Sequence, residues 1–257
     1  MDFGIENRLS RIFKPKTGKT VMLAVDHGYF QGPIMGLRDM SKDITSLLPY
    51  VDCLFITRGM LRRCIDPTSD VSTCLRVSGG PSILGELSNE DITTSMEEAI
   101  RLNASGVGMS IFVGAKNEDR TISNLGKLIN EAERYGMPVL AVTAVGKEMV
   151  RGARYLALAC RIAAEIGAHF VKTYYCEGFD KVVEGCPAPI VMAGGKKIPE
   201  KEALQMTANA IKEGASGVDM GRNIFQSDNP VGMIQAIRAV VHDGASVEEA
   251  LKIYSKK

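Results

Sequence analysis

Two apolar runs joined by a helical stretch decide the fold: 189-PIVMAGGKKIPEKEALQMTANAIKEGASGVDMG-221. The runs "PIVMAG" (189–194) and "SGVDMG" (216–221) are mostly apolar throughout rather than alternating, which is typical of parallel strands covered on both faces. The stretch between them has helical periodicity, with Pro199 at its start and Gly214 at its end, the usual asymmetry of a helix. We therefore predict a strand–helix–strand unit with parallel strands.

Runs of the same kind recur along the whole chain. Six more precede this unit: "TVMLAVD" (20–26), "VDCLFIT" (51–57), "TCLRVS" (73–78), "GVGMSIF" (106–112), "PVLAVT" (138–143) and "AHFVKT" (168–173). Eight units of about 28 residues in a chain of 257 residues predict an α/β fold, a single (β/α)8 TIM barrel over residues 1–257. The alternative is an open doubly wound sheet, but no intact G-x-G-x-x-G follows the first strand.

Helical patterns lie between or after these strands. One is expected over 89–106 with Asn89 as its cap, and another over 153–168. The stretch 229–244 repeats the Pro–Gly asymmetry with Pro230 and Gly244, and a last helix is expected over 246–257. The third unit is the least regular, because "GGPSILGELSN" (79–89) is weak as a helix.

Composition excludes several classes of protein. Lys+Arg is 31 and Asp+Glu is 30, so nothing global favours nucleic acid or an anionic membrane surface as a partner. No apolar run reaches the roughly 18 residues that span a bilayer, and the first residues are too charged for a signal peptide. The six cysteines form no C-x-x-C pair, so we expect reduced thiols and a cytoplasmic protein.

Polar residues follow the strands at one predicted end of the barrel. These are Asp26 and His27 after the first strand, Lys172 at the end of the sixth, Gly194 and Gly195 after the seventh, and Gly221 and Arg222 after the eighth. Active sites of such barrels lie at the carboxyl ends of the strands. A carboxylate, an imidazole, an amine, a glycine pair and an arginine are therefore expected at one mouth.

The last two strand ends predict a phosphate site. Glycines let backbone N–H groups approach a phosphate, and Arg222 supplies charge-assisted hydrogen bonds. In barrels such a site often uses a short extra helix, which "GRNIFQSDNP" (221–230) can supply. Taken alone, "AGGKK" (193–197) fits equally well a glycine turn with solvated lysines.

Lys172 is the candidate nucleophile. A nucleophilic amine needs its pKa lowered by desolvation or by nearby cations, for which we expect Lys196 or Arg222. Such an amine condenses with a ketone to an iminium, which accepts electrons when an adjacent C–C bond breaks. The alternative is a lysine whose ammonium group reaches water.

Asp26 and His27 are the candidate acid–base groups beside this iminium. His169 and His242 fall inside predicted elements and are expected to be structural. Three histidines in the chain make a poor ligand set, so we predict no catalytic metal. Cys176 is a weak alternative nucleophile, because no histidine pairs with it in sequence.

Four motifs make the resemblance to a known family specific: "VMLAVDHGYFQGP" (21–33), "VKTYY" (171–175), "VMAGGKK" (191–197) and "GASGVDMGRNIFQSDNP" (214–230). The chain resembles the class I aldolase family that includes archaeal-type fructose-bisphosphate aldolases. "ELSNE" (86–90), "AVTAVGKEMVR" (141–151) and "GCPAPIVMAGGKK" (185–197) resemble a thiolase branch that processes phosphorylated autoinducer-2. The likeness runs from about Leu9 to the C-terminus.

The resemblance implies the barrel fold, Lys172 as the Schiff-base lysine and Asp26 as the acid of the first strand. It places Gly194, Gly195, Gly221 and Arg222 at the phosphate. The implied reaction moves an acetyl group from 3-hydroxy-2,4-pentanedione 5-phosphate to coenzyme A and leaves dihydroxyacetone phosphate. No bound cofactor is implied, since coenzyme A is a co-substrate, and a ring-shaped homo-oligomer, such as a decamer, is expected.

Two departures from the family pattern are visible. Archaeal-type aldolases carry a tyrosine proton donor after the fifth strand, where this chain reads "VLAVTAVGKEM" (139–149) with no aromatic residue. The N-terminus also looks shorter than in the thiolase branch. The first departure favours the thiolase over an aldolase acting on a ketose phosphate. A non-catalytic phosphosugar sensor is a third hypothesis, against which Lys172 and Asp26 argue, because a binder needs no amine.

Overall fold

Eight parallel strands close into a barrel in the computed structural model, which describes residues 2–144 and 150–256. The strands are β1 (Thr20–Ala24), β2 (Cys53–Thr57), β3 (Ser72–Arg76), β6 (Gly106–Ile111), β7 (Val139–Thr143), β8 (Phe170–Tyr174), β9 (Ile190–Ala193) and β10 (Gly217–Met220). Each pairs with its neighbour in chain order, and β10 pairs with β1, Thr20 facing Gly217. Each overlaps one of the eight predicted runs, with β3 starting one residue before its run and β8 ending one residue after its run, so the barrel is confirmed and the open sheet is excluded.

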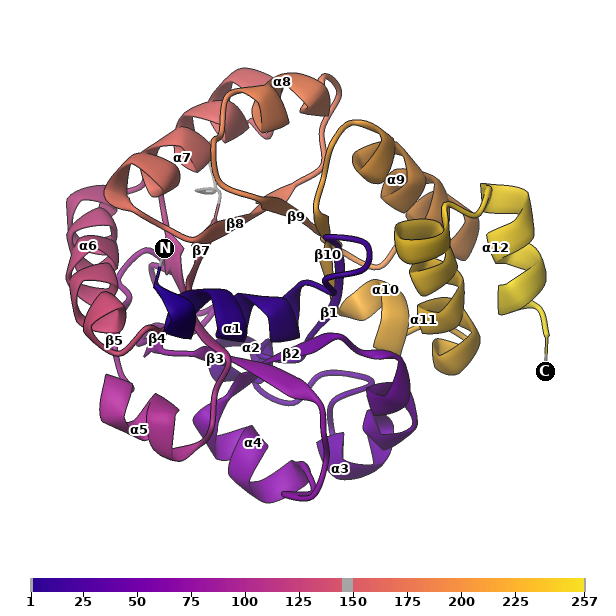
Figure 1. The fold of residues 1–257 in the computed structure, drawn as a ribbon, viewed down its shortest axis with the longest axis horizontal. Helices are drawn as coiled ribbons and strands as arrows, with labels where there is room; N and C mark the ends of the chain where they lie inside the picture. Colours follow the sequence, from indigo (N-terminus) through magenta and orange to yellow (C-terminus); the bar gives the residue numbers. More distant parts are fainter. Residues whose placement is uncertain (1, 145–149, 257) are drawn as a thin grey trace.

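Helices surround the barrel, as Figure 1 shows. They are α2 (Gly28–Gln31), α3 (Met40–Asp43), the 3-10 helix η1 (Thr45–Tyr50), α4 (Arg58–Cys64), α5 (Met96–Arg101), α6 (Glu118–Arg134), α7 (Ala153–Ile166), α8 (Phe179–Glu184), α9 (Glu200–Lys212), α10 (Arg222–Phe225), α11 (Pro230–Arg238), the π-helix η2 (Ala239–Asp243) and α12 (Val247–Tyr254). The predicted helices after Gly152, Pro199, Asn229 and Ser246 are confirmed. The short helix expected after Gly221 is α10.

The helix expected from Asn89 was wrong. Residues Asp91–Ile92 form a short strand, β5, which pairs antiparallel with β4 (Ser78–Gly79), and α5 begins only at Met96. Ser95 caps this helix by accepting a hydrogen bond from the Glu98 backbone. The reason is tertiary, because the preceding Glu90 is buried and bound inside the barrel mouth.

The amino-terminal end of the barrel is closed by α1 (Phe3–Ile12), a helix that the sequence reasoning did not propose. Figure 1 shows α1 crossing the barrel opening. Ile12 packs into the barrel interior against Phe55 and Phe170, among other residues. A Cβ on Gly106, the first residue of β6, would lie 3.0 Å from Ile12 Cδ1. The floor of the barrel is therefore apolar and sealed, which leaves the carboxyl ends of the strands for chemistry.

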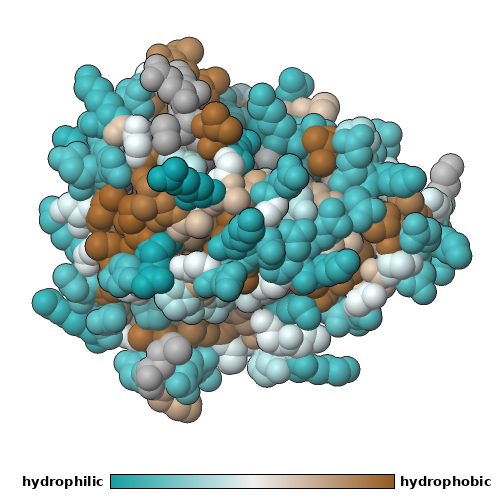
Figure 2. Space-filling view, turned by 90° about the horizontal axis from the view of Figure 1, so that it is seen from above, coloured by the Kyte–Doolittle hydropathy of each residue, from teal (hydrophilic) through white to brown (hydrophobic). Residues whose placement is uncertain are grey.

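The larger apolar core lies between the strands and the helices, and the outer surface is mostly polar. The face in Figure 2 is largely hydrophilic, with hydrophobic atoms showing between the polar side chains. Among the described residues, no helix is both long and apolar enough to span a bilayer. All six cysteines are free, and Cys64 is the one that is not buried.

Two histidines have the structural roles expected of them. His242 Nε2 lies 2.7 Å from Asp52 Oδ2, and its Nδ1 lies 2.9 Å from the Thr17 hydroxyl. Arg238 and the Val21 backbone also bind the buried Asp52. His169 Nδ1 accepts a hydrogen bond from the Val139 backbone. Both histidines therefore join strand starts to neighbouring elements and lie outside the polar mouth.

Candidate active site

Strand alternation aims the polar side chains into the barrel. Successive residues of a strand point to opposite faces, so the residue two places after an inward apolar residue also points inward. Met22 and Ala24 lie in the interior cluster, and Asp26 follows them. Phe170 likewise precedes Lys172, and Cys74 precedes Arg76. The same pleat that builds the apolar floor thus supplies the polar layer above it.

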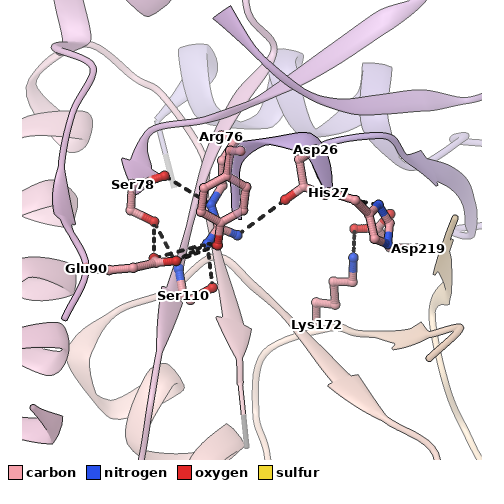
Figure 3. Close-up of polar contacts among 9 residues, drawn as sticks. Asp26, His27, Arg76, Ser78, Glu90, Ser110, Lys172 and Asp219 are labelled. Carbon is pink, nitrogen blue, oxygen red and sulfur yellow. Dashed lines mark hydrogen bonds and ion pairs between the residues drawn. The ribbon is translucent and has the colours of Figure 1, made fainter. Parts of the chain in front are cut away.

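The sequence predicted Lys172 at the end of the sixth strand, but this residue lies in the middle of β8. Its Nζ lies 2.8 Å from Asp219 Oδ2 of β10, and the two side chains are 12% and 0% exposed (Figure 3). The alternative of a lysine that reaches water is therefore wrong. The Phe55 ring lies 5.2 Å from the ammonium nitrogen, and Gly108 leaves the space for that ring, since a Cβ there would lie 2.8 Å from it.

Asp219 is the residue that sequence reasoning missed. Burial raises the pKa of this carboxyl, while Lys172 acts against the rise. Its Oδ1 has no hydrogen-bond partner within the described part of the chain. Asp219 can therefore accept the proton that Lys172 must lose before it attacks a carbonyl. The one signal for it was a carboxylate within an apolar run, in "SGVDMG".

Arg76 centres a second buried network that the sequence reasoning also missed. Its Nη2 donates to Glu90 Oε1 at 2.9 Å and to Ser110 Oγ at 2.6 Å, and it also contacts the Tyr29 hydroxyl. Ser78 donates to Glu90 Oε2 at 2.7 Å. Burial raises the pKa of Tyr29, so its hydroxyl stays protonated, and it donates its hydrogen bond to Glu90 Oε1. The network presents a permanent cation and a neutral hydroxyl to the barrel mouth.

Asp26 lies between the Arg76 network and the Lys172–Asp219 pair in Figure 3. Its Oδ2 lies 3.4 Å from Arg76 Nη1, and its Oδ1 lies 4.0 Å from His27 Nδ1. Burial lowers the pKa of His27 to about 4; Asp26 opposes this shift, and the cations of Lys172 and Arg222 reinforce it. His27 is thus a neutral imidazole at neutral pH, and its buried Nδ1 has no hydrogen-bond partner among the described residues.

The part of the cavity where we predicted phosphate binding has two arginines, the predicted Arg222 and Arg151, which was not predicted. Arg222 and Arg151 both line the cavity above Lys172, and Arg151 lies 3.8 Å from the centre of the Tyr174 ring. Burial lowers the pKa of Arg222, and the buried Nε of this residue has no hydrogen-bond partner within the described residues. An unpaired guanidinium beside a second one favours an anionic ligand.

The predicted glycines lie beside this cavity rather than in its wall. Ala193 and Arg222 line it, and Gly194 and Gly221 are their chain neighbours. Asn223 holds the two loops together, because its Nδ2 donates to the Gly194 carbonyl at 2.6 Å and its Oδ1 accepts from the Ile198 backbone. Gly221 must be small, since a Cβ would lie 2.5 Å from the Ala24 oxygen. Gly195 has a φ of +67°, which favours glycine.

The lysine environment differs from the prediction in one further respect. Lys196 is exposed and does not line the cavity, so Lys172 has a carboxylate as its direct partner instead of this cation. The cavity itself has a volume of about 240 Å³ and is also lined by Asp26, His27 and Arg76. Residues 145–149, where the family's tyrosine would be sought, lie outside the described residues.

In residues 2–144 and 150–256, no group of three His, Cys, Asp or Glu side chains could hold a metal ion. Cys176 is buried, with its pKa raised by burial, and does not line the cavity, which does not favour it as a nucleophile.

Comparison with known proteins agrees with this geometry. Residues 20–227 match the family model described as DeoC/LacD family aldolase. A 3-hydroxy-5-phosphonooxypentane-2,4-dione thiolase of Escherichia coli K12 is 54% identical over 255 residues, which cover 99% of this chain and 88% of the relative. An uncharacterized aldolase of Pasteurella multocida is 52% identical over 255 residues, with the same coverage of both chains. The crystal structure of an archaeal fructose 1,6-bisphosphate aldolase superposes with a TM-score of 0.83 at 27% identity, covering 93% of this chain and 100% of that one.

Proposed function

The chain belongs to the DeoC/LacD aldolase family, and we propose that it is a thiolase that moves the acetyl group of 3-hydroxy-2,4-pentanedione 5-phosphate to coenzyme A. The observation that carries the proposal is the Lys172–Asp219 pair beneath a cavity lined by arginines. Arg222 and Arg151 lie near Tyr174, whereas Arg76 comes from β3, three strands from β10 around the barrel. A phosphorylated diketone has a phosphate for the first pair and a second carbonyl for Arg76.

The first half of the reaction forms an iminium. Asp219 takes the proton of the Lys172 ammonium group, and the free amine attacks the ketone next to the phosphate ester carbon. Asp219 returns this proton to the carbinolamine oxygen, water leaves, and a positively charged iminium links substrate and enzyme. Arg222 and Arg151 hold the phosphate and so fix which of the two carbonyls reaches the lysine.

The second half breaks the C–C bond. The thiol gives its proton to Asp26, and its sulfur attacks the acetyl carbonyl, whose oxygen becomes an anion facing Arg76 and Tyr29. The bond between the acetyl carbon and the hydroxyl-bearing carbon then breaks, and its electron pair moves into the iminium to give an enamine. Asp26 returns the proton to this carbon, and water releases dihydroxyacetone phosphate from Lys172. His27 is a neutral imidazole 4.0 Å from Asp26, and we propose that it assists Asp26 in this proton transfer.

The test supplies purified protein with the phosphorylated diketone, with and without coenzyme A. We expect equal amounts of acetyl-coenzyme A and dihydroxyacetone phosphate, formed only when the thiol is present. Thiol-independent release of dihydroxyacetone phosphate would contradict the proposal. Faster cleavage of fructose 1,6-bisphosphate would instead support the second candidate, a class I aldolase, which the archaeal aldolase structure favours.

The cellular setting and the assembly belong to the same proposal. A cytoplasmic role in autoinducer-2 catabolism, a quorum-sensing pathway, follows from this substrate. For the assembly, the proposal is a ring-shaped homo-oligomer such as a decamer. Mass measurement in solution tests the assembly, and a monomer at micromolar concentration would contradict it.

A further inference from the structure

A second cavity adjoins the catalytic one and has no role in the chemistry described so far. Its volume is about 620 Å³, within the range of small-molecule sites. Asp26 and Tyr29 line both cavities, so this stretch after β1 forms their common border. The catalytic cavity is smaller, at about 240 Å³, so we expect the thiol of coenzyme A to enter from a neighbouring space.

The wall of the second cavity suits a long, mostly apolar arm. Val25, Leu37 and Met40 are buried and form its inner part, while Met60 and Cys64 of α4 form another side. The pantetheine arm of coenzyme A is a flexible chain of methyl, methylene and amide groups. Methionine side chains adapt well to such a chain.

Two arginines mark the opening. Arg38 and Arg63 line the cavity and are exposed to solvent, and neither has an ion-pair or hydrogen-bond partner over 2–144 and 150–256. The one other carboxylate of the wall besides Asp26 is Asp39, which is paired with Lys42 at 3.1 Å. Unpaired guanidinium groups at the mouth of an apolar cavity favour a ligand with phosphates at one end.

Resting on the proposed function, we infer that this second cavity receives the pantetheine arm of coenzyme A, with Arg38 and Arg63 binding its phosphates. The thiol end then reaches the border at Asp26, which takes the thiol proton. This arrangement gives the thiol and the phosphorylated diketone separate entrances, and the two ligands meet at one carboxylate.

Cys64 provides a readout that does not need turnover, because it is the one cysteine that is not buried. The 2-pyridyl disulfide of coenzyme A exchanges with a thiolate: the cysteine sulfur attacks the coenzyme A sulfur, and 2-thiopyridone leaves. We expect saturable modification of Cys64, at least tenfold faster than by the 2-pyridyl disulfide of 2-mercaptoethanol. The modified protein should lose acetyl transfer and still trap dihydroxyacetone phosphate on Lys172 with borohydride.

Variants separate the two ends of the ligand. Arg38→Ala combined with Arg63→Ala should remove the rate advantage of the coenzyme A reagent and raise the KM for coenzyme A at least tenfold. The KM for the diketone should not change. The rate at which the 2-pyridyl disulfide of pantetheine modifies Cys64 should not change either, because this reagent lacks the nucleotide phosphates. Arg134→Ala, an exposed arginine at the C-terminal end of α6, is the matched control.

Equal rates for the coenzyme A and 2-mercaptoethanol reagents, or unchanged kinetics in the double variant, would overturn this inference. Either result leaves the thiolase proposal standing if acetyl-coenzyme A still forms. Thiol-independent cleavage of the diketone would instead overturn the thiolase proposal, whatever the labelling shows.

Discussion

Replacement of Asp219 by asparagine tests the pair on which the proposed chemistry rests. The amide has nearly the shape of the carboxylate, so the change removes a charge without opening a cavity. In the wild-type protein Lys172 Nζ and Asp219 Oδ2 lie 2.8 Å apart, and the side chains of Lys172 and Asp219 are 12% and 0% exposed. The substitution therefore leaves a largely buried ammonium group without its anion. Breaking a buried ion pair by removing one partner costs about 3–5 kcal/mol. We expect the low end, about 3 kcal/mol, because Lys172 also borders the cavity.

The same substitution should slow formation of the iminium. Without Asp219 the lysine loses its nearest proton acceptor, and a positioned acid or base contributes typically about 10²–10⁴-fold. Urea unfolding gives the free energy of unfolding, and borohydride trapping of dihydroxyacetone phosphate gives the rate at Lys172. Asp228→Asn, the same change at an exposed carboxylate, should alter the free energy by less than about 0.5 kcal/mol. A loss below about 1 kcal/mol in Asp219→Asn, together with trapping at the wild-type rate, would refute this reasoning.

Three further outcomes are expected. Arg222→Ala should cost about 2–3 kcal/mol in kcat/KM for the phosphorylated substrate and less for a dephosphorylated one, whereas equal losses would assign Arg222 to the fold. Burial lowers the pKa of His27 from 6.5 to about 4, so the unfolded chain binds more protons than the folded chain between these pH values. The free energy of unfolding should therefore fall by up to about 3 kcal/mol as the pH drops from 6.5 to 4. His27→Asn should flatten that slope in urea titrations, and an unchanged slope would show that other groups cause it. Activity should survive prolonged treatment with a strong chelator, and loss that a divalent cation restores would show that a metal takes part.

The strands and their order could be predicted from the sequence, because their signal is local. A strand covered on both faces is mostly apolar, and most of the eight runs satisfy this condition. Lys172, Asp26, His27 and Arg222 could be predicted as cavity residues for the same reason, since polar residues in or after such runs stand out. The role of each in the reaction stays a prediction.

Tertiary structure alone decided the partners within the site. Asp219 looked like one polar residue in an apolar run, and only the pairing of β8 and β10 with β9 in the curved sheet brings it to within 2.8 Å of Lys172, two strands away. Arg76 and Glu90 likewise meet through side chains, and their contact replaces the helix expected at Asn89 with β5. Local periodicity shows which way a side chain points, but not which side chain it meets there. That depends on the register of the closed barrel and on the burial of each charge, and both arise only when distant strands pack together.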